Sequence, residues 1–158
     1  MRLEYFQMID RIVTLDVDGR RVRSACTVPK QSTIFEGHFP TYPLMPGVLL
    51  IETMAQTSGW LVVAINRFER MPFLAAVKDA KLRTFVTPGQ VISGSAKLKH
   101  DGSGYAMTEA QLAIDGKTVC EATLTFSVLA FPNPEMSQRM RETAAKIDFP
   151  MLGAPADG

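Results

Sequence analysis

The sequence predicts an α+β protein in which a curved antiparallel sheet wraps around one long central helix. The first observation is the order of the expected elements: two strands, one long helix and then a run of strands. Elements segregated along the chain in this way favour an antiparallel sheet. The second observation is that residues 48–66 are apolar all round a helical wheel. A helix of this kind must be buried on most of its sides.

Two antiparallel strands are expected within residues 6–29. An apolar run at residues 9–15 precedes Asp18-Gly19, a dipeptide that is typical of a tight hairpin turn. After this turn, Val22, Cys26 and Val28 stand among alternating polar residues, as in a strand with one buried face.

The long helix is expected to begin near Pro46, because the missing N–H of proline costs nothing in a first helical turn. Residues 48–66 are just long enough to span a bilayer. However, Glu52 and Gln56 lie within this segment, and a carboxylate in mid-membrane costs about 3 kcal/mol on insertion scales. We therefore expect a core helix and no integral membrane segment.

Three or four further antiparallel strands are expected within residues 73–131. Turn signals at residues 101–104 and at Asp115-Gly116 separate them, and residues 120–128 alternate between apolar and polar side chains. We expect a single domain over residues 1–131. Residues 132–158 are expected to form a C-terminal tail, with a short polar helix over residues 135–147 and a loose end rich in proline and glycine.

Composition argues against several classes of protein. A formal net charge of +1 gives no support to a nucleic-acid-binding surface. Two cysteines without a Cys/His cluster favour neither a disulfide scaffold nor a metal site. Glycine-rich nucleotide-binding motifs are absent, so no cofactor is expected. Residues 1–11 carry acids and no apolar stretch, which predicts a cytoplasmic protein without a signal peptide.

Four residues around the start of the helix form a candidate acid–base device. His38 is a ready proton acceptor, since the ordinary pKa of histidine is about 6.5. Glu52 stands among apolar residues, and burial would raise the pKa of its carboxyl into the range of a general acid. Gln56, four residues on, shares its helix face and could hold that carboxyl. The N–H of Gly47, at the helix N-terminus, could bind a carbonyl oxygen.

Such a device suits abstraction of a proton α to a carbonyl, with a leaving group at the β position. Each residue also has a simpler interpretation. Glu52 could emerge at a helix end, His38 could be structural, and Gly47 could only relieve crowding after Pro46. These alternatives remain open on the pattern alone.

Residues 37–56 read GHFPTYPLMPGVLLIETMAQ and closely resemble the signature GHFPxxPxMPGVLxxExxAQ of the FabZ-type β-hydroxyacyl-acyl carrier protein dehydratases. Weaker likeness extends over residues 6–130. The resemblance implies the hot-dog fold and loss of water from a (3R)-3-hydroxyacyl thioester to give the trans-2-enoyl thioester, in fatty-acid or specialised acyl-chain biosynthesis. It assigns His38 as the catalytic histidine, Glu52 as the catalytic acid, Gly47 as the carbonyl-binding amide and Gln56 as the residue that orients the acid.

The resemblance also implies an acyl carrier protein as partner, and a homodimer in which one subunit supplies the histidine and the other the glutamate. Such dimers can assemble into trimers of dimers. The candidate lining of the acyl tunnel comprises Phe39, Leu44, Met45, Phe85, Val86 and Pro88. An acyl carrier protein is acidic, so a basic rim is expected where it docks. The candidates for this rim are Lys78, Lys81 and Arg83, with Arg21 and Arg23 behind them.

Some positions depart from the family pattern, including Thr41 and Tyr42 in the loop and a longer tail after Phe131. These departures motivate the hypothesis of a specialised paralogue that acts on an unusual acyl chain or carrier. Two other readings remain: another hot-dog thioester enzyme, either a thioesterase or an enoyl-CoA hydratase, and a non-catalytic hot-dog subunit. The His-Phe-Pro loop disfavours a thioesterase, and the presence of both His38 and Glu52 disfavours a non-catalytic subunit.

Overall fold

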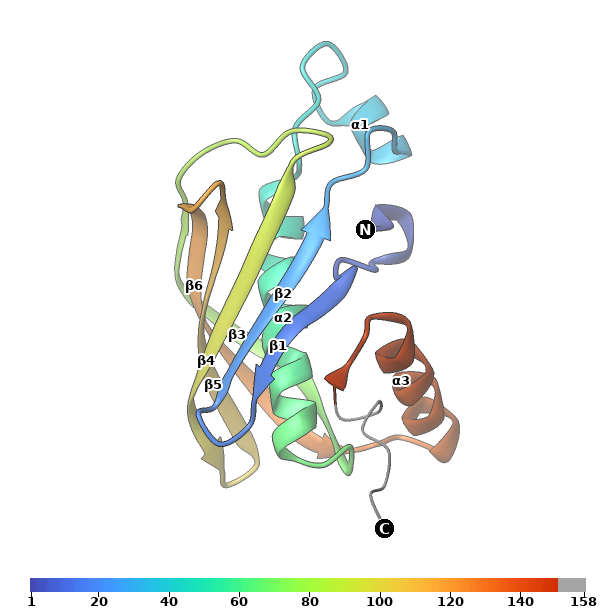
Figure 1. Cartoon of the computed structure of the whole chain (residues 1–158), viewed down its shortest axis with the longest axis vertical. Helices are drawn as coiled ribbons and strands as arrows, with labels where there is room; N and C mark the ends of the chain where they lie inside the picture. Colours follow the sequence, from blue (N-terminus) through green and yellow to red (C-terminus); the bar gives the residue numbers. More distant parts are fainter. Residues whose placement is uncertain (151–158) are drawn as a thin grey trace.

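The computed structural model describes residues 1–150 and contains one six-stranded antiparallel sheet curved around a long helix (Figure 1). The order of strands across the sheet is β1-β2-β4-β5-β6-β3. The strands are β1 (Arg11–Asp16), β2 (Arg21–Thr27), β3 (Arg70–Leu82), β4 (Val91–Gly102), β5 (Tyr105–Ile114) and β6 (Lys117–Ala130). Two strands before the long helix and four after it agree with the expected α+β order.

The central helix α2 (Gly47–Ile65) lies in the concave side of the sheet. Buried residues surround its axis, from Leu49 and Leu50 at one end to Val63 and Ala64 at the other. The helix is long and apolar enough to cross a membrane, but 67% of that stretch is buried inside the protein. It is therefore the core helix that the sequence predicts. Pro46 is its N-cap residue and lies just before the first turn.

Hydroxyl groups join α2 to the sheet. The Thr57 and Ser24 hydroxyl oxygens lie 2.8 Å apart, and Thr108 donates to the hydroxyl of Ser58 over 2.9 Å. All four side chains are buried, and these hydrogen bonds offset the cost of removing them from water. Gly94 of β4 lies against this network, where a side chain would have no room.

Replacing Gly94 with alanine is expected to lower the free energy of unfolding by about 2 kcal/mol. The added Cβ would overlap the Ser24 hydroxyl and lie 2.9 Å from the Thr57 hydroxyl, both of which are buried and hydrogen-bonded. Urea unfolding measures the cost. Gly37→Ala is the matched control, because a Cβ there meets nothing within 4 Å. Equal costs for the two variants would contradict this account of the packing.

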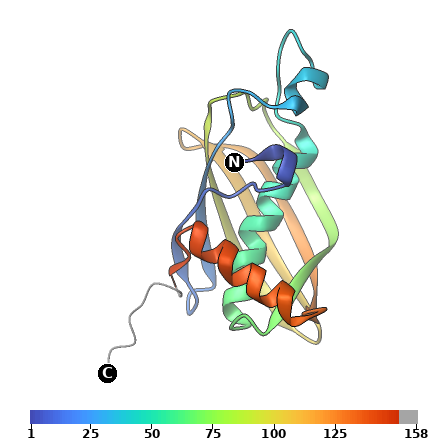
Figure 2. The same ribbon diagram turned by 90° about the vertical axis from the view of Figure 1, so that its right-hand side faces the viewer.

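The short helix expected over residues 135–147 is α3 (Pro134–Lys146). Asn133 caps it by accepting a hydrogen bond from Met136 N over 2.8 Å, and Pro134 occupies the first turn. The helix crosses the open side of α2, the side that the sheet leaves uncovered (Figure 2). Ala144, Ile147 and Phe149 are buried and extend the hydrophobic core beyond residue 131. The loose end expected for the tail lies largely outside the described residues.

A short helix that the sequence did not predict, α1 (Thr33–Gly37), precedes the Pro/Gly-rich loop. Ser32 caps it by accepting from Ile34 N over 3.1 Å. Glu4 accepts from the Ser32 hydroxyl over 2.6 Å and from Thr33 N over 3.0 Å, so the N-terminal segment holds α1 in place. This helix ends immediately before His38.

Candidate active site

His38 is held in one orientation by the loop that follows α1. Its backbone N–H donates to Ile34 O over 2.9 Å, and its ring Nδ1 lies 2.9 Å from Leu44 O. A carbonyl oxygen can only accept, so Nδ1 carries the hydrogen and Nε2 is the unprotonated nitrogen of the neutral ring. The ring of Phe39 packs edge-on against His38, with 4.6 Å between ring centroids. The half-buried imidazole is therefore fixed with Nε2 as its proton acceptor.

His38 opens into a cavity of about 460 Å³ at the N-terminal end of α2. Five of the six expected tunnel residues line this cavity, whereas Pro88 does not. The remaining lining comes from the start of α2, the end of β3 and the segment after it: Gly47, Leu50, Leu82, Arg83 and Thr84. The cavity is largely apolar apart from His38, Arg83 and Thr84, which suits an acyl group near a proton acceptor.

Gly47 is the first residue of α2 and lines the same cavity as His38. The first backbone N–H groups of a helix have no partner within it, and the helix dipole places a partial positive charge there. Pro46 has no side chain that could cap them. A Cβ on Gly47 would collide with the side chain of Leu82. Glycine thus leaves room for the Leu82 side chain at the helix N-terminus, on the cavity that His38 also lines.

Gln56 holds the carboxyl of Glu52, as the spacing on the helix indicates. Gln56 Nε2 donates to Glu52 Oε1 over 2.8 Å and to Phe6 O over 2.6 Å. Gln56 Oε1 accepts from Met8 N over 3.0 Å. The N-terminal segment therefore fixes Gln56, which in turn fixes Glu52. The contribution of Phe6 and Met8 comes from backbone groups, so no sequence pattern could indicate it.

Glu52 is half-buried at the wall of a second cavity, which lies between the two interpretations that the sequence pattern left open, burial and emergence from the helix. The carboxyl is not fully enclosed because the sheet leaves this face of α2 open. The second cavity has a volume of about 550 Å³ and does not include His38. Within one chain, the proposed base and the proposed acid thus open into different cavities.

The long strand β3 is the edge strand of the sheet next to these cavities. Within residues 1–150 it pairs with β6 on one side only. Apolar side chains remain exposed along it, namely Phe73, Leu74, Val77 and Leu82. An exposed apolar edge strand of this length is a template for pairing with another chain.

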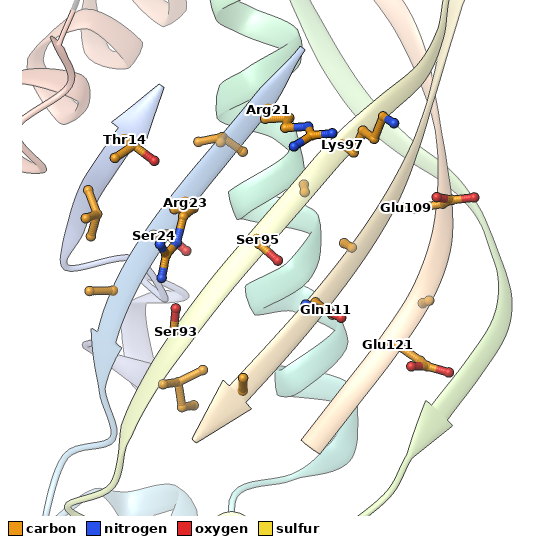
Figure 3. A pocket seen from close by; sticks show the side chains of 18 of the residues that line it. Thr14, Arg21, Arg23, Ser24, Ser93, Ser95, Lys97, Glu109, Gln111 and Glu121 are labelled. Carbon is orange, nitrogen blue, oxygen red and sulfur yellow. The ribbon is translucent and has the colours of Figure 1, made fainter. Parts of the chain in front are cut away.

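The basic residues considered for carrier docking do not form one patch. Arg83 lines the His38 cavity, and its guanidinium donates to Glu121 Oε1 over 2.6 Å. Together with Lys81, 3.7 Å from the same oxygen, it lowers the pKa of Glu121. Arg21, Arg23 and Lys81 line a hollow of about 1090 Å³ on the outer face of the sheet. Figure 3 shows Arg21 and Arg23 on the opposite side of this hollow from Glu109 and Glu121.

The two cysteines are unsuited to nucleophilic chemistry. Cys26 and Cys120 are both buried and unpaired. Burial raises the pKa of the Cys26 thiol to about 12 and that of the Cys120 thiol to about 11. Both thiols therefore stay protonated at neutral pH.

Comparison with known proteins gives a family and a fold. A family model described as a FabA-like domain matches residues 2–123. A protein of Fusobacterium nucleatum named 3-hydroxyacyl-[acyl-carrier-protein] dehydratase FabZ is 32% identical over 123 residues, covering 78% of this chain and 86% of the relative. A protein of the same name from Chlamydia pneumoniae is 32% identical over 127 residues, covering 78% of this chain and 83% of that relative.

Two solved structures share the architecture. A hypothetical thioesterase of Streptococcus pneumoniae with coenzyme A matches with a TM-score of 0.61 at 15% identity, covering 78% of this chain and 88% of that one. The dehydratase heterocomplex ApeI:P of Xenorhabdus doucetiae matches with a TM-score of 0.61 at 17% identity, covering 85% and 90% of the two chains. These likenesses confirm the expected hot-dog fold and carry no further conclusion at such low identity.

Proposed function

This chain belongs to the family of proteins with a FabA-like domain, and we propose that it dehydrates (3R)-3-hydroxyacyl-[acyl carrier protein] to the trans-2-enoyl thioester. One observation carries the proposal. The imidazole of His38 is fixed with Nε2 as acceptor in an apolar cavity that also contains the helix N-terminus at Gly47. A proton acceptor beside unpartnered amides is what proton removal next to a thioester carbonyl requires.

The reaction follows from these positions. The thioester oxygen accepts a hydrogen bond from Gly47 N–H, which stabilises the negative charge that develops when the α proton leaves. His38 Nε2 takes that proton from C2. The C2–H electrons form the C2–C3 double bond as the C3–O bond breaks, and Glu52 donates a proton so that the hydroxyl departs as water. Transfer of a proton from the imidazolium back to the carboxylate restores both groups.

The separation of the two cavities supports a homodimer as the active unit. In the proposed dimer, His38 of one subunit and Glu52 of the other face the same substrate. The free edge of β3, with its exposed apolar side chains, is the surface that a second copy would cover. The trimer of dimers is a further assembly that the proposed reaction does not need.

The acyl group is proposed to arrive on an acidic acyl carrier protein in the cytoplasm. Arg83 supports docking at the His38 cavity, because it is the basic residue that lines it. Lys78 is exposed on the neighbouring part of β3. The free cysteines are consistent with a reducing compartment.

The proposal is tested by incubating the protein with a (3R)-3-hydroxyacyl-[acyl carrier protein] series and following the mass of the acyl carrier protein. Loss of one water with the acyl group still attached is the expected result. Release of the free thiol without loss of water would instead indicate a thioesterase. No reaction across all chain lengths and carriers would overturn the proposed activity.

A further inference from the structure

We propose that helix α3 forms the far wall of the pocket that receives the acyl chain, and that Met140 limits the length of chain the enzyme accepts. This inference rests on the proposed function, because it assigns the cavity beside Glu52 to the acyl group of that substrate. It names a specificity-determining residue outside the motif that carries the acid and the base.

The cavity beside Glu52 is built for a substrate with one reactive end and an apolar chain. Glu52 and Gln56 stand on the wall formed by α2. Next to them, the lining from α2, β3 and β6 is apolar: Ala55, Gly59, Trp60, Met71, Pro72, Leu74 and Phe126. The N-terminal segment adds apolar, polar and charged residues to the lining: Met1, Arg2, Phe6, Gln7, Ile9 and Asp10. The wall formed by α3 comprises Met140, Thr143 and Lys146, with Ile147 directly after the helix.

Several independent contacts fix α3 in place, so it forms a wall rather than a loose cover. Ile12 N of strand β1 donates to Ile147 O over 2.8 Å. The ring of Phe149 packs against Trp60 and Phe68, at centroid distances of 5.5 and 5.3 Å. The guanidinium of Arg141 lies 4.9 Å from the ring centroid of Phe68. Arg141 lies within α3, and Ile147 and Phe149 follow it directly, so these contacts hold the C-terminal end of the helix.

The wall is also a feature of this chain beyond the segment shared with its family. The FabA-like family model matches residues 2–123, and α3 begins at Pro134. A property set by α3 therefore does not follow from family membership. Met140 is partly buried against the core and presents a flexible thioether side chain to the cavity.

The physical effect of this wall is a limit on chain length. Each methylene moved from water into an apolar pocket strengthens binding by about fourfold. A chain that reaches Met140 gains nothing from further methylenes and has to displace the side chain. Met140→Ala removes most of that side chain and is expected to admit about two more methylenes, which raises kcat/KM for the first excluded chain length about tenfold.

The experiment compares Met140→Ala with the matched control Met136→Ala, one turn earlier on α3. Met136 is exposed and does not line the cavity. kcat/KM is measured for 3-hydroxyacyl-[acyl carrier protein] substrates of increasing chain length. The wild type and Met136→Ala are expected to accept acyl chains up to the same length, and Met140→Ala is expected to accept longer ones. Gly59→Ala should lower the limit, because its methyl enters the cavity in ordinary contact with Pro72, at 3.7 Å.

A binding measurement separates this inference from the proposed activity. Trp60 is the single tryptophan of the chain and lines the cavity, so its fluorescence reports an acyl chain that enters. Saturated acyl-[acyl carrier protein] lacks the hydroxyl and cannot react. The longest acyl chain that changes the fluorescence is expected to be longer for Met140→Ala than for the wild type. This result supports the wall even if no substrate is dehydrated. The proposed wall would be overturned if the wild type, Met140→Ala and Gly59→Ala had the same maximum chain length, both in binding and in any turnover.

Discussion

Replacing Glu52 with glutamine is expected to lower kcat/KM for dehydration by about 1000-fold without loss of the fold. Glutamine has nearly the same shape and retains an oxygen that can accept from Gln56 Nε2, now 2.8 Å from Glu52 Oε1. It has no acidic proton for the departing hydroxyl. The rate is measured on the best wild-type substrate, with thermal unfolding as the test of folding.

Glu69→Gln is the matched control for that variant, because Glu69 is an exposed acid shortly after the end of α2. It should retain full activity. A folded Glu52→Gln protein with more than a tenth of the wild-type rate would show that Glu52 is not the acid.

Replacing His38 with alanine is expected to lower kcat/KM for dehydration by about 1000-fold, since the α proton then has no acceptor. His38 lies outside the hydrophobic core and makes one side-chain hydrogen bond, to Leu44 O, so the fold should survive its removal. Single-turnover kinetics separates loss of the proton-transfer step from loss of binding.

The chain contains its own control for this variant. His100 is the second histidine of the chain and lies in β4, where its ring stacks on Tyr105 with 4.2 Å between ring centroids. His100→Ala should leave the rate of dehydration unchanged. Equal losses for both histidine variants would mean that the effect of His38→Ala is structural.

The sequence predicts the fold well where a pattern reports burial directly. The helix at α2 was predictable because a helix that is apolar all round and carries Glu52 and Gln56 is expected to be buried in a protein core. Strand β6 was predictable because Cys120, Ala122 and Leu124 alternate with polar residues, and the structure buries these three. In both elements, local pattern and tertiary environment agree.

Other elements depend on contacts between residues far apart in the chain. The edge strand β3 begins at Arg70, earlier than expected, and contains Pro72 and two irregularities in its pairing with β6. An edge strand tolerates proline and bulges, so it lacks a clean alternation. Helix α1 was missed because its placement depends on Glu4, whose carboxylate accepts from Ser32 and Thr33.

The candidate site shows the same division. The residues themselves could be predicted from the motif, and so could the bond between Gln56 and Glu52 four residues apart. The assignment of His38 and Glu52 to two separate cavities could not, because it follows from how the sheet curves around α2. The same holds for the wall formed by Met140, since nothing in the composition of α3 indicates which face meets the cavity.

In the proposed dimer, each active site combines His38 of one subunit with Glu52 of the other. Mixing His38→Ala and Glu52→Gln subunits, unfolded together and refolded, tests this most directly. Half of the resulting dimers contain one chain of each kind, and each of these has one intact site out of two. The mixture of two inactive parents is therefore expected to recover about a quarter of the wild-type rate. A mixture that forms dimers but remains as inactive as its parents would contradict it.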